Sequence, residues 1–212
     1  PLTNDTTAKV MIAGAMASFY GINPKTDYDN CQMVLYVGTN PMVSHAHNTG
    51  MFKPGNWLKA INKRGGEVWV IDPVRTETAN FAKGHIAAYP GRDYAVLAWI
   101  VREILAGGPL NPQQPVKNLD RLRSLLADYD RTKAAEIAGV PEEQLQELLD
   151  AIRRRKTLAI ETGPGTGMSP GGNLTVWFAW LIAILTGSMN VKGGLWVHPG
   201  ALFPFDQFVD HP

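Results

Sequence analysis

The sequence lacks several features that would assign a function directly. It contains one cysteine, Cys31, so these residues hold no disulfide framework and no cysteine-based metal or iron–sulfur site. The formal net charge is +1, which argues against a nucleic-acid partner and against a polybasic membrane patch. No apolar run reaches the roughly 18 residues that span a membrane. The longest candidate, residues 174–185, is therefore better explained as a buried helix.

Two familiar phosphate-binding motifs are also missing. An apolar run at residues 33–37 leads into Gly38-Thr39-Asn40-Pro41, which has neither the three glycines of a dinucleotide fingerprint nor the Gly-Lys-Ser/Thr of a P-loop. A signal peptide is not evident, since the chain begins at Pro1 without a basic segment followed by an apolar one. We expect a piece of a longer polypeptide, so the sequence assigns no compartment, cytoplasmic or periplasmic.

Short apolar runs alternate with helical patterns, and 45% of the residues are apolar, which is enough for a substantial core. The expected strands lie at residues 33–37, 67–73, 85–91, 157–162 and 195–199, and the expected helices at residues 10–20, 56–65, 94–108, 119–156 and 174–185. This alternation predicts a doubly wound α/β fold with a mostly parallel sheet, Rossmann-like topology and a helical excursion at about residues 111–156. We expect a single domain over residues 1–212.

Helix ends are indicated by capping residues. Asn56 is expected to cap the second helix and Gly65 to end it. Asp93 is expected to cap the third helix. Pro141 takes the first position of a helix that ends in the basic residues 153–156, which suits the helix dipole.

Polar and glycine-rich loops follow four of the expected elements, and ligands of open parallel sheets bind at the carboxyl ends of the strands. The candidate residues are Gly38, Thr39, Asn40, Pro41 and Ser44 in the first loop; Asp72, Pro73, Arg75 and Thr76 in the second; Gly91 and Asp93 in the third; and Gly163, Gly165, Thr166 and Gly167 in the fourth. Backbone amides and an arginine suit phosphate, while carboxylates suit ribose hydroxyls or the N–H edge of guanine. The set therefore predicts a nucleotide site.

Each of these features also has a purely structural explanation. A glycine-rich turn after a strand is most often structural, Asp72 before Pro73 can form an Asx turn, and Asp93 can be only an N-cap. His45 and His47 share one face of an extended segment, but no third metal ligand is evident. Cys31 is expected to be a buried small thiol, and residues 153–156 a solvated helix end. The aromatic side chains of Trp177, Phe178 and Trp180 are expected in the core.

Four segments in this order resemble the molybdopterin oxidoreductases of the dimethyl sulfoxide reductase family, which include formate dehydrogenases. They are VLYVGTNPMVSH, GGEVWVIDPVRTETA, HIAAYPGRD and GPGTGMSPGGN with the following LTGSMNVKGG. The resemblance covers roughly residues 29–194. It implies that the chain is one nucleotide-binding domain of a large catalytic subunit, which binds part of a bis-molybdopterin guanine dinucleotide (bis-MGD) carrying molybdenum or tungsten.

The resemblance also implies roles for the loops. Gly38, Thr39 and Asn40 would meet the pyrophosphate, and Asp72, Pro73 and Arg75 would lie along the nucleotide. Asp93 would recognise the guanine or its ribose, and residues 163–167 would border the cofactor nearer the pterin. No catalytic residue and no protein ligand to the metal is assigned. A [4Fe–4S] centre is expected only in a missing N-terminal region, with the rest of the chain, electron-transfer subunits and a small-molecule substrate as partners.

The sequence departs from the family pattern at three points. Ala46 follows His45 where the family usually has proline, Val74 separates the Asp-Pro pair from Arg75, and Arg92 precedes Asp93 where threonine is common. Two other interpretations stay open. One is a nicotinamide-dependent dehydrogenase domain, which predicts a glycine fingerprint that the first loop lacks. The other is a non-catalytic relative such as the large peripheral subunit of respiratory complex I.

Overall fold

The structure is a computed structural model, and it describes residues 11, 14–15, 24–45, 51–107, 111–112, 115–155 and 157–197. The helix expected at residues 10–20 lies mostly outside these ranges, as do Ala46, His47 and residues 108–110 and 113–114.

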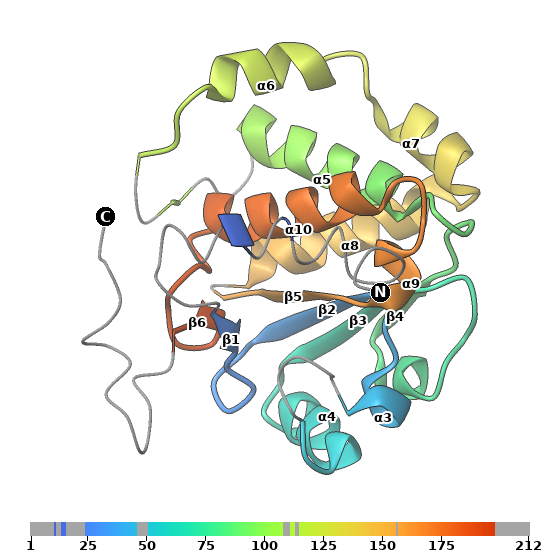
Figure 1. Cartoon of the computed structure of the whole chain (residues 1–212), viewed down its shortest axis with the longest axis vertical. Helices are drawn as coiled ribbons and strands as arrows, with labels where there is room; N and C mark the ends of the chain where they lie inside the picture. The colour runs from blue at the N-terminus through green and yellow to red at the C-terminus, as the bar shows by residue number, and fades with distance from the viewer. Residues whose placement is uncertain are drawn as a thin grey trace.

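A four-stranded parallel sheet forms the centre of the fold (Figure 1). Its strands are β2 (Met33–Val37), β3 (Glu67–Ile71), β4 (Gly84–Ile86) and β5 (Ala159–Thr162). Their order across the sheet is β4-β3-β2-β5, which matches the first four strands of the doubly wound order 3-2-1-4. The predicted fold class is therefore confirmed, and the chain changes direction across the sheet between β2 and β5. That boundary is the topological switch point.

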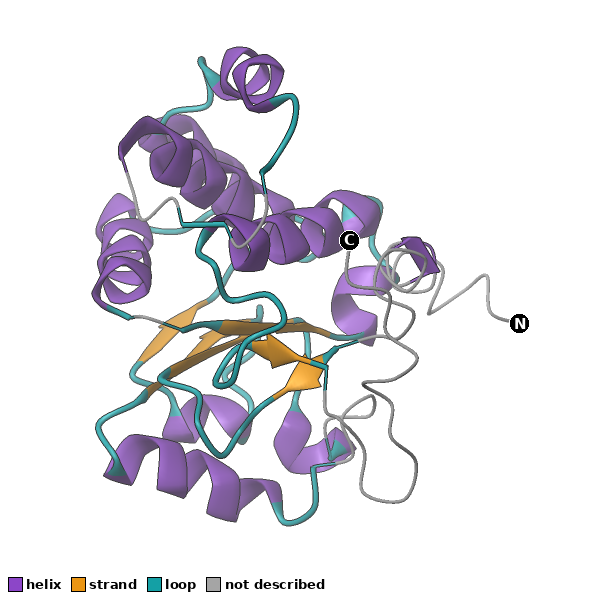
Figure 2. Ribbon diagram, turned by 90° about the vertical axis from the view of Figure 1, so that its left-hand side faces the viewer, coloured by secondary structure: helices purple, strands orange, loops and turns teal. Residues whose placement is uncertain are grey.

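Helices cover both faces of the sheet, which explains why its strands are continuously apolar (Figure 2). Met33 and Leu35 face the side that carries α5 (Asp93–Gly107), α8 (Glu142–Arg154) and α10 (Gly172–Leu185). Val34 and Tyr36 face the side that carries α4 (Pro54–Lys63). The shorter elements are α3 (Pro41–Ser44), the 3-10 helix η1 (Thr78–Phe81), α9 (Pro164–Gly167), β1 (Lys25–Thr26) and β6 (Leu195–Trp196). β1 and β6 pair antiparallel, apart from the main sheet.

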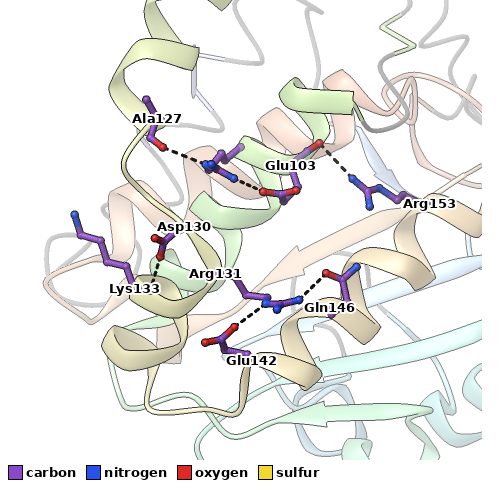
Figure 3. A network of polar contacts seen from close by, with 9 residues as sticks. Glu103, Ala127, Asp130, Arg131, Lys133, Glu142, Gln146 and Arg153 are labelled. Carbon is purple, nitrogen blue, oxygen red and sulfur yellow. Dashed lines mark hydrogen bonds and ion pairs between the residues drawn. The ribbon is translucent and has the colours of Figure 1, made fainter.

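The helical excursion between β4 and β5 is confirmed. After α5 it consists of α6 (Leu119–Leu126), α7 (Arg131–Ala138) and α8 (Glu142–Arg154). Arg131 joins α7 to α8, because its Nε donates to Glu142 Oε2 at 2.8 Å and its Nη1 to Gln146 Oε1 at 3.1 Å (Figure 3). These pairs are partly exposed, so they orient the two helices more than they stabilise them.

The N-cap of α7 offers a test of this outer layer. Asp130 accepts a hydrogen bond from the Lys133 backbone N–H at 2.8 Å (Figure 3). Asp130→Ala leaves that N–H without its cap, so we expect a loss of about 1 kcal/mol in the free energy of unfolding, measured in urea. Asp128→Ala is the matched control, since Asp128 is exposed and makes no hydrogen bond or ion pair within the described chain, and it should change little. Equal effects of the two variants would contradict the capping role.

Helix boundaries differ from expectation in detail. α4 begins at Pro54 with Lys53 as its N-cap, so the prediction of Asn56 as the cap was wrong; proline suits a first helical position because no N–H is needed there. Pro141 is likewise the N-cap of α8 and not its first residue. Asp93 lies inside the first turn of α5. Gly65 does follow the end of α4 in a left-handed conformation, as predicted.

α10 is the apolar helix expected near residues 174–185, but it is not buried all round. Phe178 is buried as predicted, whereas Trp177 is 39% exposed, so its placement in the core was wrong. α10 packs against α5, β5 and α9, while Leu174 and Trp177 on it remain exposed. Within the described residues, no helix is both long enough and apolar enough to cross a membrane.

Candidate functional site

The loops after β2 and β5 interlock at the switch point. The Gly163 N–H and the Thr166 hydroxyl both donate to the Val37 carbonyl oxygen, each at 2.9 Å. The Gly165 N–H donates to the Gly38 carbonyl oxygen at 3.2 Å. The two glycine-containing loops that the sequence singled out therefore form one continuous structure.

Two of the glycines are required by this loop packing. Gly38 has φ +57°, and a Cβ there would lie 2.5 Å from Thr166 Oγ1. A Cβ on Gly163 would lie 2.3 Å from the Gly38 carbonyl oxygen, which is closer than any real contact. Side chains at either position would force the loops apart. Loop packing alone thus accounts for these glycines, as the structural explanation anticipated.

Two adjacent backbone N–H groups in the first loop have no acceptor within the described part of the chain. From Gly38 to His45, the other N–H groups all have acceptors: Gly38 donates to Ile71, Met42 to the Thr78 hydroxyl, Val43 and Ser44 to Asn40, and His45 to Pro41. Pro41 has no N–H. Among the described residues, nothing accepts a hydrogen bond from the N–H of Thr39 or of Asn40. Adjacent free N–H groups at the carboxyl edge of a parallel sheet are suited to an anion.

The side chain of Asn40 is engaged within the protein. Its Oδ1 accepts a hydrogen bond from the Thr78 hydroxyl at 2.6 Å, and its Nδ2 donates to Glu77 Oε2 at 2.7 Å. Thr78 and Glu77 belong to the loop after β3, so these bonds join the first and second candidate loops. The sequence did not single out either residue, because a threonine and a glutamate in a polar segment carry no distinctive signal.

The second loop contains the expected Asx turn. Asp72 Oδ1 accepts a hydrogen bond from the Val74 N–H at 3.0 Å, and the Asp72 carbonyl oxygen lies 2.8 Å from His85 Nε2 of β4. Thr76 is half-buried and its carbonyl oxygen accepts the Ala79 N–H, while Pro73 is exposed. Arg75 is exposed, and within the described chain its guanidinium has no acceptor. Arg75 is therefore free to meet an anionic ligand.

Asp93 is the most unusual titratable group at this edge. It is only 4% exposed, and no other described residue donates a hydrogen bond to its carboxyl group. Burial, and to a smaller extent the nearby Asp72 carboxylate, raise the pKa of Asp93 to about 6, although a hydrogen bond from its own backbone N–H partly opposes them. Asp72 and Asp93 are thus brought together from two loops, as predicted. A buried carboxylate that accepts only from its own backbone N–H has unused acceptor capacity.

The third and fourth loops also meet. A Cβ on Gly91 would lie 3.1 Å from Ser169 Cβ, so the turn before α5 contacts the turn that leads into α10. Ser169 in turn donates to the Thr166 carbonyl oxygen at 2.8 Å. The remaining candidates lie around this rim: Pro41 is buried, Gly167 is half-buried and Ser44 is exposed.

The opposite end of the sheet has a different character. Cys31 is fully buried, which raises the pKa of its thiol to about 11, so it is an inert small side chain, as expected. A cavity of about 380 Å³ lies nearby, between Tyr28, Trp57 and Trp196. The Asp27 carboxylate that borders it accepts bonds from the Gly193 N–H and from Asn30, each at 2.9 Å. This carboxylate is committed to the fold, unlike that of Asp93.

No family model matches the chain, but curated proteins do. An assimilatory nitrate reductase of Haloferax mediterranei is 27% identical over 198 residues, which are 90% of this chain and 27% of the relative. The dimethyl sulfoxide/trimethylamine N-oxide reductase of Rhodobacter capsulatus is 28% identical over 148 residues, 65% of this chain and 18% of the relative. Formate dehydrogenase H of Escherichia coli is 25% identical over 171 residues, 79% of this chain and 23% of the relative.

The chain is a homologue of the molybdopterin oxidoreductases. Among solved structures, acetylene hydratase from Pelobacter acetylenicus has the same fold, with a TM-score of 0.68 and 20% identity over 85% of this chain and 24% of its own. The chain spans between 18% and 27% of the length of the curated molybdopterin oxidoreductases described above.

Proposed function

We propose that the chain binds the guanine dinucleotide part of a molybdopterin cofactor, one of the two dinucleotides of bis-MGD. The observation that carries this proposal is the pair of N–H groups at Thr39 and Asn40, which lack an acceptor among the described residues and lie at the switch point, where doubly wound sheets bind ligands. These two groups would donate to the pyrophosphate. Arg75, which is exposed and without an acceptor in the described chain, would add a charge-assisted hydrogen bond.

The carboxylates of Asp93 and Asp72 are suited to the guanosine end of such a ligand. Asp93 is buried, and within the described chain its carboxyl group accepts only from its own backbone N–H, so it can also accept from the N1–H and N2–H₂ groups of guanine or from ribose hydroxyls. Adenine presents no such pair of donors to a carboxylate, which makes Asp93 the basis for guanine selectivity. Asp72 already accepts the Val74 N–H through one oxygen, which leaves its other oxygen for the nucleotide.

In this proposal the chain contributes binding and orientation, and the molybdenum or tungsten cofactor, when bound, supplies the two-electron redox chemistry of a small substrate, as in formate dehydrogenases. The described residues hold the dinucleotide by its phosphates and base. A [4Fe–4S] centre, electron-transfer subunits and further domains of the same polypeptide would belong to the complete enzyme. The chain by itself is expected to be inactive.

Calorimetric titration of the purified protein with GDP, ATP and NAD tests this proposal. We expect GDP to bind more tightly than ATP or NAD, because only guanine offers two donors to Asp93. NAD binding in preference to GDP would favour a nicotinamide-dependent dehydrogenase domain. Binding of none of the three would favour a structural relative such as the large peripheral subunit of respiratory complex I.

Arg75 provides a specific prediction for the same titration. Arg75→Gln should weaken GDP binding roughly tenfold, because a charge-assisted hydrogen bond to phosphate contributes about 1.5 kcal/mol or more. Arg121→Gln is the matched control, since Arg121 is an exposed arginine of α6 in the outer helical layer and should leave the affinity unchanged. If both variants lose affinity equally, the loss results from the change in net charge, and Arg75 does not contact the ligand.

A further inference from the structure

Thr78 is buried at the junction of the first two loops. It is fully inaccessible, its hydroxyl donates to Asn40 Oδ1 at 2.6 Å, and the same oxygen accepts the Met42 backbone N–H at 3.2 Å. A hydroxyl group has one proton and two lone pairs, so both bonds form at the same time. Thr78 therefore holds the first loop at two points, one on a side chain and one on the backbone.

Two backbone N–H hydrogen bonds bracket the Thr39 and Asn40 N–H groups, which have no acceptor among the described residues. On one side, the Gly38 N–H is fixed to the Ile71 carbonyl oxygen at 2.9 Å. On the other side, the Met42 N–H is fixed to Thr78. Thr39 and Asn40 lie between them, and the side chain of Asn40 is tied down by Thr78 and by Glu77. The backbone that carries the two unpaired donors is thus restrained at both ends and in the middle.

We propose that Thr78 is a positioning residue of the phosphate site, and that Asn40 serves this site through its backbone N–H while its side chain serves the loop. The inference rests on the proposed function. Its physical basis is preorganisation, because a loop that is already ordered loses less conformational entropy when the ligand binds. Without Thr78, the two N–H groups remain present but are no longer held in place.

Two substitutions at Thr78 separate this role from general stability. Thr78→Val keeps the shape and removes the hydroxyl, whereas Thr78→Ser keeps the hydroxyl and removes a methyl group. The measurement is the affinity for GDP and for guanosine, which lacks phosphate. Thr78→Val should weaken GDP binding roughly tenfold, equivalent to one hydrogen bond, and leave guanosine binding unchanged. Thr78→Ser should restore GDP binding even though the lost methyl group lowers its melting temperature.

Substitution of Asn40 provides a second test of this proposal, and it does not require changing a buried residue. Asn40 is half-exposed, so Asn40→Ala should fold, and it should weaken GDP binding to the same extent as Thr78→Val. Because the two residues share the Thr78–Asn40 hydrogen bond, the double variant should lose less affinity than the sum of the two single losses. Additive losses would mean that the Asn40 side chain touches the ligand directly, and would overturn the inference.

The Thr78→Val titration can also overturn the proposed positioning role of Thr78. If Thr78→Val bound GDP like the wild-type protein, or lost GDP and guanosine affinity equally, Thr78 would have no specific effect on the phosphate site. The proposed function itself is tested separately by the wild-type protein and by Arg75→Gln. A wild-type protein that bound neither ligand would overturn both proposals, whereas selective GDP binding without a Thr78 effect would overturn this one alone.

Discussion

Gly163→Ala is expected to lower the free energy of unfolding by about 3 kcal/mol, at the upper end of the range for overpacking. The added Cβ would lie 2.3 Å from the Gly38 carbonyl oxygen and 2.4 Å from Thr39 Cβ. Neither atom is the flexible end of a long side chain, so relief requires movement of the backbone. Urea denaturation measures the loss, and GDP titration should show weaker binding, because Thr39 carries one of the free N–H groups.

The control for this variant is Gly55→Ala. Gly55 lies in α4, and a Cβ there would meet nothing closer than the Met42 side chain at 3.5 Å, an ordinary contact. Alanine in place of an unstrained helical glycine should stabilise the protein by about 0.5–1 kcal/mol. The two glycine-to-alanine changes are thus expected to have opposite signs. A Gly163→Ala protein as stable as wild type would mean that the β2 and β5 loops are not in direct contact.

Asp93→Asn is expected to stabilise the unliganded protein at neutral pH while weakening its affinity for GDP. The pKa of Asp93 rises from 3.8 to about 6 on folding, because burial and the Asp72 carboxylate disfavour its charged form. A shift of that size corresponds to about 3 kcal/mol of stability lost on ionisation. The neutral amide avoids this cost, but it cannot accept two hydrogen bonds from a guanine edge as a carboxylate does.

Because folding raises the pKa of Asp93, the effect of this carboxyl group on the free energy of unfolding depends on pH in a defined direction. The folded protein binds the Asp93 proton more tightly than the unfolded chain, so the cost of burial is absent below about pH 4, the unfolded-state value. It grows as the pH rises and is complete above about pH 6, the folded-state value. The difference in unfolding free energy between Asp93→Asn and wild type should follow this curve. A difference that is independent of pH would mean that Asp93 does not titrate in this window.

Asp72→Asn is the companion measurement. Removing the second carboxylate should lower the pKa of Asp93 and move the pH curve of the wild-type protein toward more acidic values. The Asx turn should survive, because an asparagine Oδ1 can still accept the Val74 N–H. If the curve does not move, burial alone sets the pKa of Asp93.

The central sheet was predictable because its strands are covered on both faces. β2 reads as five consecutive apolar residues, and all five are fully buried. The rule that parallel strands end at one edge then placed the four loops together, including Asp72 and Asp93. These conclusions need only local sequence and a general property of the fold, which is why they hold.

The hydrogen bonds within the site were not predictable in the same way. The Thr78 hydroxyl reaches Asn40 across 38 positions of sequence, and no local pattern of either residue indicates that pairing. Trp177 was misplaced for a related reason: an apolar helix predicts burial, but which side stays uncovered depends on where α5 and β5 lie. Helix starts were misjudged because Lys53 and Pro54 together replaced the more usual asparagine cap.

The long route from β4 to β5 has a kinetic consequence. The bond from the Thr166 hydroxyl to the Val37 carbonyl oxygen closes a loop of 129 residues, whereas β2, β3 and β4 follow one another closely in sequence. High contact order slows folding, so the packed loops at the switch point are expected to form after the β2–β4 unit. Since closure entropy grows only logarithmically with loop length, the excursion can accept insertions between its helices at little thermodynamic expense. The ligand site would thus be completed last during folding, while its distant sequence remains free to vary in length.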